Sequence, residues 1–497
     1  MNWRHFIIAF AILTTVPVMA ADQATTFRRL EAKFQEAIRL RQAKDWKACV
    51  KHVRAVIGAS DFAGLNKKFR NSTYYLALSC SLDAGDLAAS QAFAVQATLE
   101  DDASAEMWRL RGEVEMRNVS QPTAAVIGLE AMAARAPDAL NGLPQKLIYE
   151  YYNRVKKGPD ASLRRRTLEV FAAKAYQPHE IGGTADHFRS ELAKLRAAEG
   201  DRTGASTLIA TIAQPIVLLE LSLDPRTRSL IPDDFNFRAV TERELAHRRD
   251  VAASHPASLV AVIEVANALR MLGRYEEALA GLAAASPEGA AADTFTDHDK
   301  QLNWWWDAVA FANANLGRYD AALAAFQQGI TVIERGGANV SQLINLAIVQ
   351  MNFGRDVDAI ATLAPMREGK GTSPYGALLM ISARGCARFR VGDKVGSDAD
   401  YTYAKMHEQD APGTLTSLAL CRNDLDEAAA SLVRRLDHME QRIEALVTVS
   451  DFDPPPAAFP KQVEDERLAL VKARPEVKAA IARAGGARRF NLMSPPF

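Results

Sequence analysis

Three segments in the second half of the chain share one pattern of helix, glycine turn and helix. They read VANALRMLGRYEEAL at residues 265–279, VAFANANLGRYDAAL at residues 309–323, and LAIVQMNFGRDVDAI at residues 346–360. Their turn glycines are 44 and 37 residues apart. A single hairpin of amphipathic helices cannot bury both of its apolar faces, so such hairpins must stack on their neighbours. The repetition therefore predicts a helical solenoid.

Small residues at fixed positions indicate how each hairpin closes. Gly273, Gly317 and Gly354 end the first helix of each pair, because glycine readily adopts the left-handed conformation that stops a helix. We expect Tyr275 and Tyr319 to fill the turns. Five residues after each glycine, an alanine lets the second helix approach the first closely: Ala278, Ala322 and Ala359.

These hairpins resemble the tetratricopeptide repeat family. One of them carries residues at the positions that the family packs between its helices: Trp306, Val309, Ala310, Gly317, Tyr319, Ala322 and Phe326. The resemblance implies an all-α fold, an α-solenoid of stacked antiparallel helix hairpins, which binds protein or peptide segments on its concave face. The first repeat step exceeds the family's usual period of about 34 residues. The surplus falls in Gly289–Lys300, which we expect to form a loop.

Weaker copies of the hairpin extend toward both ends of the chain, and two proline-rich stretches interrupt them. The first stretch reads SLDPRTRSLIPDDFNFR and the second reads DFDPPPAAFP. The sequence therefore predicts five parts: a signal peptide (1–20), degenerate N-terminal repeats (25–221), an irregular connection (222–256), a C-terminal repeat array (257–446), and a proline-rich segment with a capping helix (447–497).

The first residues have the order typical of a secretory signal peptide. A basic start is followed by an apolar run from Phe6 to Val18 and by small residues that suit cleavage after Ala20. The run is shorter than the roughly 20 apolar residues of a stable membrane anchor. We therefore expect a periplasmic or secreted protein that does not span the membrane. A retained N-terminal anchor is the alternative.

Composition and motifs argue against several functions. The chain has 60 basic and 60 acidic residues, whereas a nucleic-acid binder normally carries a basic surplus. No phosphate-binding glycine loop, G-x-S-x-G elbow or H-E-x-x-H motif occurs. We interpret Asp297-His298-Asp299 as a solvated acidic loop, because adjacent loop residues seldom converge on one metal ion. The sequence thus predicts no catalytic residue, no metal and no cofactor.

The four cysteines fall into two pairs in neighbouring hairpins. Cys49 and Cys80 are 31 residues apart, and Cys386 and Cys421 are 35 residues apart. An exported protein favours a disulfide within each pair. The other interpretation is that all four are small buried apolar side chains.

The resemblance also assigns eight positions to the ligand groove. Trp304 is the candidate anchor, because aromatic side chains carry much of the binding energy at interfaces; packing of Trp304–Trp306 against the Gly289–Lys300 loop is the alternative. Ile263 replaces the lysine with which some family members hold a terminal carboxylate, which disfavours capture of a free C-terminus. The candidate groove residues are Ile263, Asn267, Arg270, Trp304, Asp307, Phe311, Ile344 and Ile348.

Two functions are compatible with these features. The first is a non-catalytic periplasmic scaffold or adaptor that binds protein segments in the groove. The alternative is a cell-wall or carbohydrate-binding accessory protein, for which a row of exposed aromatic side chains is expected.

Overall fold

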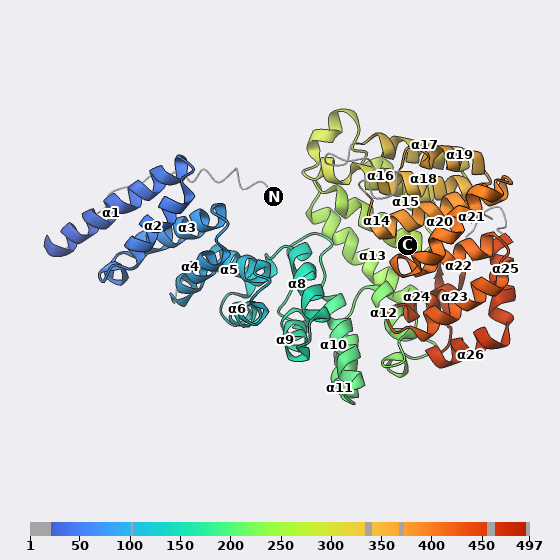
Figure 1. Cartoon of the computed structure of the whole chain (residues 1–497), viewed down its shortest axis with the longest axis horizontal. Coiled ribbons are helices and arrows are strands. Elements are labelled where there is room, and N and C mark those ends of the chain that lie inside the picture. Colours follow the sequence, from blue (N-terminus) through green and yellow to red (C-terminus); the bar gives the residue numbers. More distant parts are fainter. Residues whose placement is uncertain (1–20, 101–102, 333–339, 367–371, 455–462, 494–497) are drawn as a thin grey trace. The chain divides into compact units, whose positions relative to one another are not determined.

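Helix hairpins make up nearly all of the computed structural model, which describes residues 21–100, 103–332, 340–366, 372–454 and 463–493 (Figure 1). This confirms the predicted all-α solenoid. The chain forms two compact units, residues 1–180 and residues 181–497. Their division lies within the part that was predicted as continuous N-terminal repeats. The expected signal peptide, residues 1–20, lies outside the described residues.

Unit 1 is built from consecutive antiparallel helices. Left-handed residues separate the helices of its first two hairpins, Lys44 with a φ of 60° and Gly85 with a φ of 72°. Its elements are α1 (Ala21–Gln42), α2 (Trp46–Ile57), η2 (Phe62–Gly64), α3 (Lys67–Asp83), α4 (Leu87–Leu99), α5 (Ala105–Arg117), α6 (Pro122–Arg135), α7 (Pro137–Asn141), α8 (Gln145–Lys157) and α9 (Ala161–Ala172).

Unit 2 contains the three segments that carry the repeat pattern, as α14 to α19. The elements that precede them are α10 (Asp186–Ala198), α11 (Arg202–Ile209), α12 (Pro215–Leu223), η3 (Arg228–Leu230) and α13 (Phe237–Ser254). The repeat hairpins are α14 (Leu259–Met271) with α15 (Tyr275–Ala284), α16 (His298–Asn315) with α17 (Tyr319–Thr331), and α18 (Val340–Asn352) with α19 (Asp356–Leu363). The following elements are α20 (Pro374–Arg390), α21 (Lys394–Met406), η5 (Glu408–Asp410), α22 (Pro412–Cys421), α23 (Leu425–Asp437) and α24 (Arg442–Val449).

The turns of these hairpins have the geometry that the sequence predicts. Gly273, Gly317 and Gly354 each have a φ of 74°, which is left-handed. Asn423 takes the same role between α22 and α23, with a φ of 60°. The three alanines that follow the glycines are fully buried, so the paired helices are in close contact: Ala278, Ala322 and Ala359.

An arginine after each turn glycine also links its hairpin to the preceding one. Arg318 pairs with Glu276 in the first turn of α15, and Arg355 pairs at 2.9 Å with Asp320 in the first turn of α17. All four side chains are exposed, so each pair adds at most about 1 kcal/mol. In these two turns, the glycine thus ends a helix and the arginine that follows it contacts the neighbouring repeat.

Replacing Gly317 with valine is expected to destabilise its hairpin by about 1–2 kcal/mol or more, because a β-branched side chain strains a backbone with positive φ. Damage should stay near α16 and α17, since each hairpin is supported by its neighbours. Limited proteolysis should show faster cleavage within residues 300–332. Gly281→Val is the control, because its added side chain meets open space on α15. Cleavage of the Gly317 variant at the wild-type rate would contradict this expectation.

The predicted irregular connection, residues 222–256, differs from the structure. Most of it is the 18-residue helix α13, which begins where Asn236 accepts a hydrogen bond from the Ala239 amide at 2.9 Å. None of its three prolines lies within that helix: Pro225 and Pro232 precede it and Pro256 follows it. Phe237, Val240 and Leu245 are buried at helical spacing, and this was the overlooked signal.

The predicted loop Gly289–Lys300 is also more ordered than expected. It contains a short 3-10 helix, η4 (Gly289–Thr294), and the start of α16 at His298. Asp297 is not merely solvated, because its carboxylate accepts hydrogen bonds from the amides of Leu259 at 2.7 Å and Val260 at 3.0 Å. It thereby satisfies free N–H groups at the start of α14.

The C-terminal part, predicted as a proline-rich segment with one capping helix, contains two helices and two strands among its described residues. The helices α25 (Val463–Ala473) and α26 (Pro475–Ala484) are separate because a proline cannot continue the hydrogen bonding of the first helix. The strands β1 (Asp451–Asp453) and β2 (Arg489–Met493) pair in parallel.

Strand β2 returns to the first helices of unit 2. Phe490 is fully buried, with its ring centroid 5.1 Å from Phe237 of α13 and 5.2 Å from Phe452 of β1. Arg488 donates a hydrogen bond to the Ile231 carbonyl at 3.0 Å. The end of the chain therefore stabilises the beginning of the unit as well as its last hairpins.

Candidate functional site

A cavity of about 480 Å³ lies on the first helices of three consecutive repeats in unit 2. Its walls come from α18, α20 and α22, and α24 and the start of α25 complete it. We call it the α20–α22 cavity. First helices of neighbouring repeats run side by side, which explains why segments far apart in the sequence meet here.

One wall of the α20–α22 cavity is apolar. Leu418 is fully buried, whereas Ile348, Leu379 and Leu468 are partly exposed. Tyr375 is 59% exposed and offers an aromatic ring at the start of α20. The cavity can therefore accept apolar groups of a ligand.

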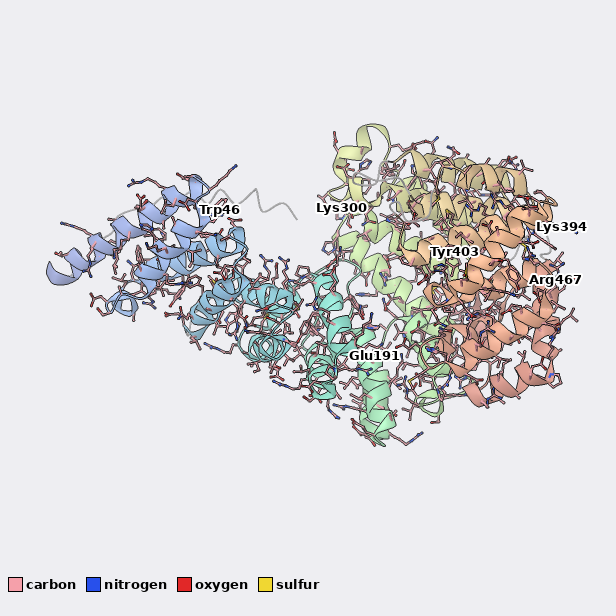
Figure 2. The ribbon with its side chains drawn as sticks, in the orientation of Figure 1. Trp46, Glu191, Lys300, Lys394, Tyr403 and Arg467 are labelled. Atoms are coloured by element: carbon pink, nitrogen blue, oxygen red, sulfur yellow. A yellow bond between two sulfur atoms is a disulfide. The ribbon has the colours of Figure 1, made fainter. Side chains whose placement is uncertain are left out.

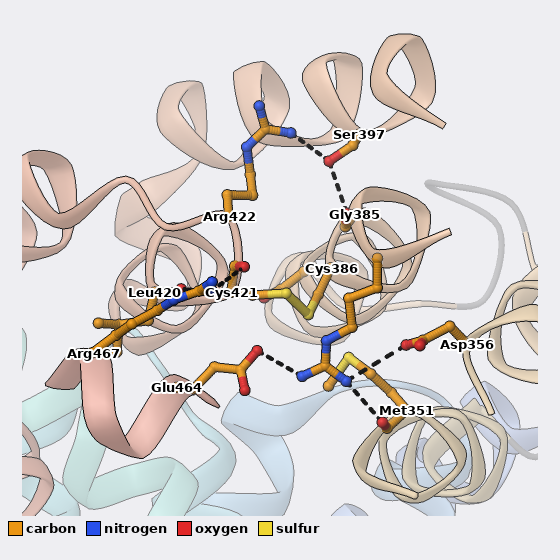
Figure 3. Close-up of a disulfide and its surroundings, with 12 residues drawn as sticks. Met351, Asp356, Gly385, Cys386, Ser397, Leu420, Cys421, Arg422, Glu464 and Arg467 are labelled. Carbon is orange, nitrogen blue, oxygen red and sulfur yellow. Dashed lines mark hydrogen bonds and ion pairs between the residues drawn. A yellow bond between two sulfur atoms is a disulfide. The ribbon is translucent and has the colours of Figure 1, made fainter. Parts of the chain in front are cut away.

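The other wall is charged and is organised around Arg390, whose partners Met351, Asp356 and Glu464 are labelled in Figure 3. The Arg390 guanidinium donates hydrogen bonds to Glu464 Oε1 at 2.6 Å and to the Met351 carbonyl at 2.9 Å. It also lies 3.5 Å from Asp356. Burial raises the pKa of Asp356 above its usual value, and Arg390 only partly offsets this.

A second ion pair borders the cavity beside α22. Arg435 is almost completely buried and donates hydrogen bonds to Thr416 Oγ1 at 3.2 Å and to Glu444 Oε1 at 3.0 Å. Burial lowers the pKa of the Arg435 guanidinium. This ion pair holds α23 and α24 against the end of the cavity formed by α22.

A disulfide forms part of the cavity wall. Cys386 of α20 and Cys421 of α22 are bonded, with their α-carbons 5.7 Å apart (Figure 3). Arg467 of α25, labelled in Figure 2, donates hydrogen bonds to the Leu420 and Cys421 carbonyls at 2.7 and 2.6 Å (Figure 3). It thereby satisfies acceptors at the end of α22. The disulfide and Arg467 together fix the end of α22.

The other two cysteines are bonded as well. Cys49 of α2 and Cys80 of α3 have α-carbons 6.0 Å apart in unit 1. Across the described residues, the one group of three close potential metal ligands is Cys386, Cys421 and Glu464. Its two sulfurs are bonded to each other and are not thiolate ligands in this state.

The structure brings some of the predicted groove residues together. Arg270 donates a hydrogen bond to Asn267 at 3.1 Å, and its guanidinium lies 4.9 Å from the Phe311 ring centroid. Burial lowers the pKa of Arg270 to about 10. Ile348 lines the α20–α22 cavity, and Trp304 is 41% exposed on α16.

Three other predicted groove residues are buried and do not face a groove. Ile263, Asp307 and Ile344 are 7%, 5% and 3% exposed. Asp307 accepts a hydrogen bond from Asn345 of the next repeat at 3.0 Å. These positions hold neighbouring repeats together.

Sequence reasoning missed several residues of the α20–α22 cavity: Tyr375, Leu379, Arg390, Glu464, Asp465 and Leu468. One of the weaker copies of the hairpin pattern, CARFRVGDK around Gly392, was a usable signal for α20. The sequence predicted a capping helix in this part of the chain, and α25 lies there. Its place in the cavity wall had no local signal, because that depends on the path of the chain after the last hairpin.

No protein-family model and no curated protein matches the chain. The described residues form a tetratricopeptide-like solenoid. Its hairpins, left-handed turns and buried alanines carry this assignment. The helices of the solenoid can be followed in Figure 1.

Solved structures similar to the solenoid include the APC/C hetero-tetramer Cut9-Hcn1, with 15% identity over 93% of this chain and 92% of that chain, and a TM-score of 0.29. Yeast Tom70 has 11% identity over 92% and 99%, with a TM-score of 0.21. Rap protein complexed with competence and sporulation factor has 11% identity over 92% and 99%, with a TM-score of 0.28. Scores this low transfer no partner or function.

Proposed function

We propose that the protein is a non-catalytic periplasmic scaffold that binds a segment of another polypeptide in the α20–α22 cavity. The observation that carries this proposal is the cavity itself, an apolar wall with a few ion-paired groups on the first helices of three successive repeats. Such a surface suits the side chains of a helical or extended segment. The ion pairs would orient that segment.

The lining residues also bear on the other functions. Tyr375 is the one aromatic residue that lines the α20–α22 cavity in the described part of the chain, which does not favour a carbohydrate as ligand. No histidine is among those lining residues, so the serines that line the cavity have no nearby imidazole base there.

A photo-crosslinking amino acid at Ser417 tests the proposal. This exposed residue lines the cavity, and it is expected to form a discrete adduct with a polypeptide in the exported fraction. The same crosslinker at Val395 of α21, which is 84% exposed and outside the cavity, is the control. Leu379→Glu should abolish the adduct at Ser417 by placing a charge on the apolar wall. Equal adducts at both positions, or none at Ser417, would refute the proposal.

The periplasmic location has its own test. The mature chain is expected to begin at Ala21, because basic, apolar and small residues precede it in the order that a signal peptidase recognises. No helix in the described part of the chain has the length and apolar character needed to cross a membrane. N-terminal sequencing of the exported protein checks the prediction, and an intact Met1 on a membrane-bound form would contradict it.

A further inference from the structure

The charged wall of the α20–α22 cavity holds more carboxylates than cations. Glu464 and Asp465 both line the cavity, and Asp465 is exposed. Asp356 is not a lining residue, but it shares the single guanidinium of Arg390 with Glu464. Within the described residues, Arg390 is the one cation paired with this group. We call Asp356, Glu464 and Asp465 the carboxylate group.

Part of this negative charge is buried without a partner. Glu464 Oε1 accepts a hydrogen bond from Arg390, but its Oε2 is buried and has no hydrogen-bond partner among the described residues. Leaving a buried carboxylate oxygen without a donor is unfavourable. Burial, together with the negative charge of Glu464, raises the pKa of Asp465, and Glu464 contributes in the same direction at Asp356. A further cation at this place would relieve all three effects.

The dipole of helix α25 explains only part of the placement of Glu464 and Asp465. Glu464 and Asp465 lie in the first turn of α25, where acidic residues stabilise a helix N-terminus. That role is met equally well by side chains that point into solvent. It does not explain why Glu464 is largely buried in the wall of a cavity with one oxygen unpaired.

We propose that the α20–α22 cavity accepts a lysine or arginine side chain of the bound polypeptide, with its charged end beside Glu464 and Asp465. The apolar stem and the flanking residues of the segment pack on Tyr375 and Leu379. Basic side chains suit such a site because their stems are apolar and their ends form charge-assisted hydrogen bonds. This inference rests on the proposed function and specifies which segments the solenoid selects.

Selection of peptides on the purified full-length protein tests the inference. A phage-displayed library of random heptapeptides is expected to yield sequences with a lysine or arginine flanked by apolar residues. The same selection on Glu464→Gln/Asp465→Asn should retain the apolar residues and lose the basic one. The matched control is Asp299→Asn/Glu440→Gln, which removes two exposed carboxylates outside the cavity and should retain both.

Binding measurements with one selected peptide then give the contribution of its basic residue. Replacing its basic residue with norleucine, which keeps the apolar stem, should weaken binding to the wild type about tenfold. The same replacement should change binding to Glu464→Gln/Asp465→Asn by less than about twofold, as in a double-mutant cycle. Asp465→Asn alone keeps the ion pair between Arg390 and Glu464. In this variant the norleucine replacement should weaken binding by an intermediate factor, which loss of folding would not produce.

The outcomes separate this inference from the proposed function. Selected peptides that crosslink to position 417 but show no basic preference would overturn the inference and leave the proposed function standing. A basic preference that persists in Glu464→Gln/Asp465→Asn would overturn it as well. Failure to select any peptide in the cavity would overturn both.

Discussion

Replacing Phe490 with alanine is expected to destabilise unit 2 by about 3–5 kcal/mol, the usual effect of truncating a fully buried phenylalanine. Its ring joins β2 to α13 and to β1, so its loss leaves a cavity where the end of the unit meets its beginning. Hydrogen exchange should become faster in α12, α13 and β2. Chemical denaturation should give the loss of stability.

Leu470→Ala is the matched control for Phe490, because Leu470 lies on α25 and is 59% exposed. It should change stability by less than about 0.5 kcal/mol, as most surface substitutions do. Exchange in unit 1 should be unchanged in both variants. Wild-type exchange in α13 of the Phe490→Ala protein would show that β2 does not hold the unit together.

Removing the disulfide between Cys386 and Cys421 should destabilise the C-terminal hairpins by about 3–4 kcal/mol, because the bond closes a loop of about 35 residues in the unfolded chain. The double variant Cys386→Ala/Cys421→Ala should expose α20 and α22 to protease before the rest of unit 2. Binding to the α20–α22 cavity should weaken with it, since both sulfurs lie in the cavity wall.

The second disulfide supplies the control. Cys49→Ala/Cys80→Ala removes a bond of similar loop length from unit 1, so protection should be lost in α2 and α3 while α20 and α22 stay as in the wild type. Mass mapping of the unreduced exported protein should find both bonds. Free thiols at Cys386 and Cys421 would leave the buried apolar role as the only one for this pair.

The hairpins of the repeat array were predictable from the sequence. A positive φ at Gly317 and a fully buried Ala322 are local requirements, which a glycine and an alanine at fixed spacing meet without help from distant residues. The pair Cys386 and Cys421 was visible for a related reason, because consecutive first helices such as α20 and α22 lie side by side and their spacing brought a bond within reach. Cys49 and Cys80 instead join the second helix of one hairpin, α2, to the first helix of the next, α3.

The groove was less predictable. Ile348 lines the α20–α22 cavity, but Ile263 and Ile344 are buried between helices. The family pattern gives the direction of a side chain relative to its own helix. It does not give the distance to the next helix, which depends on the volumes of all side chains between the two.

The sequence by itself determined the repeat hairpins and their left-handed turns, because these depend on contacts between residues close together in the chain. Tertiary structure decided where α25 and β2 lie. Contacts such as Arg390 with Glu464 and Phe490 with Phe237 join residues 74 to 253 positions apart. No periodicity in the sequence encodes such contacts. They form because the chain turns back on the solenoid after its last hairpin, and the same return completes the α20–α22 cavity.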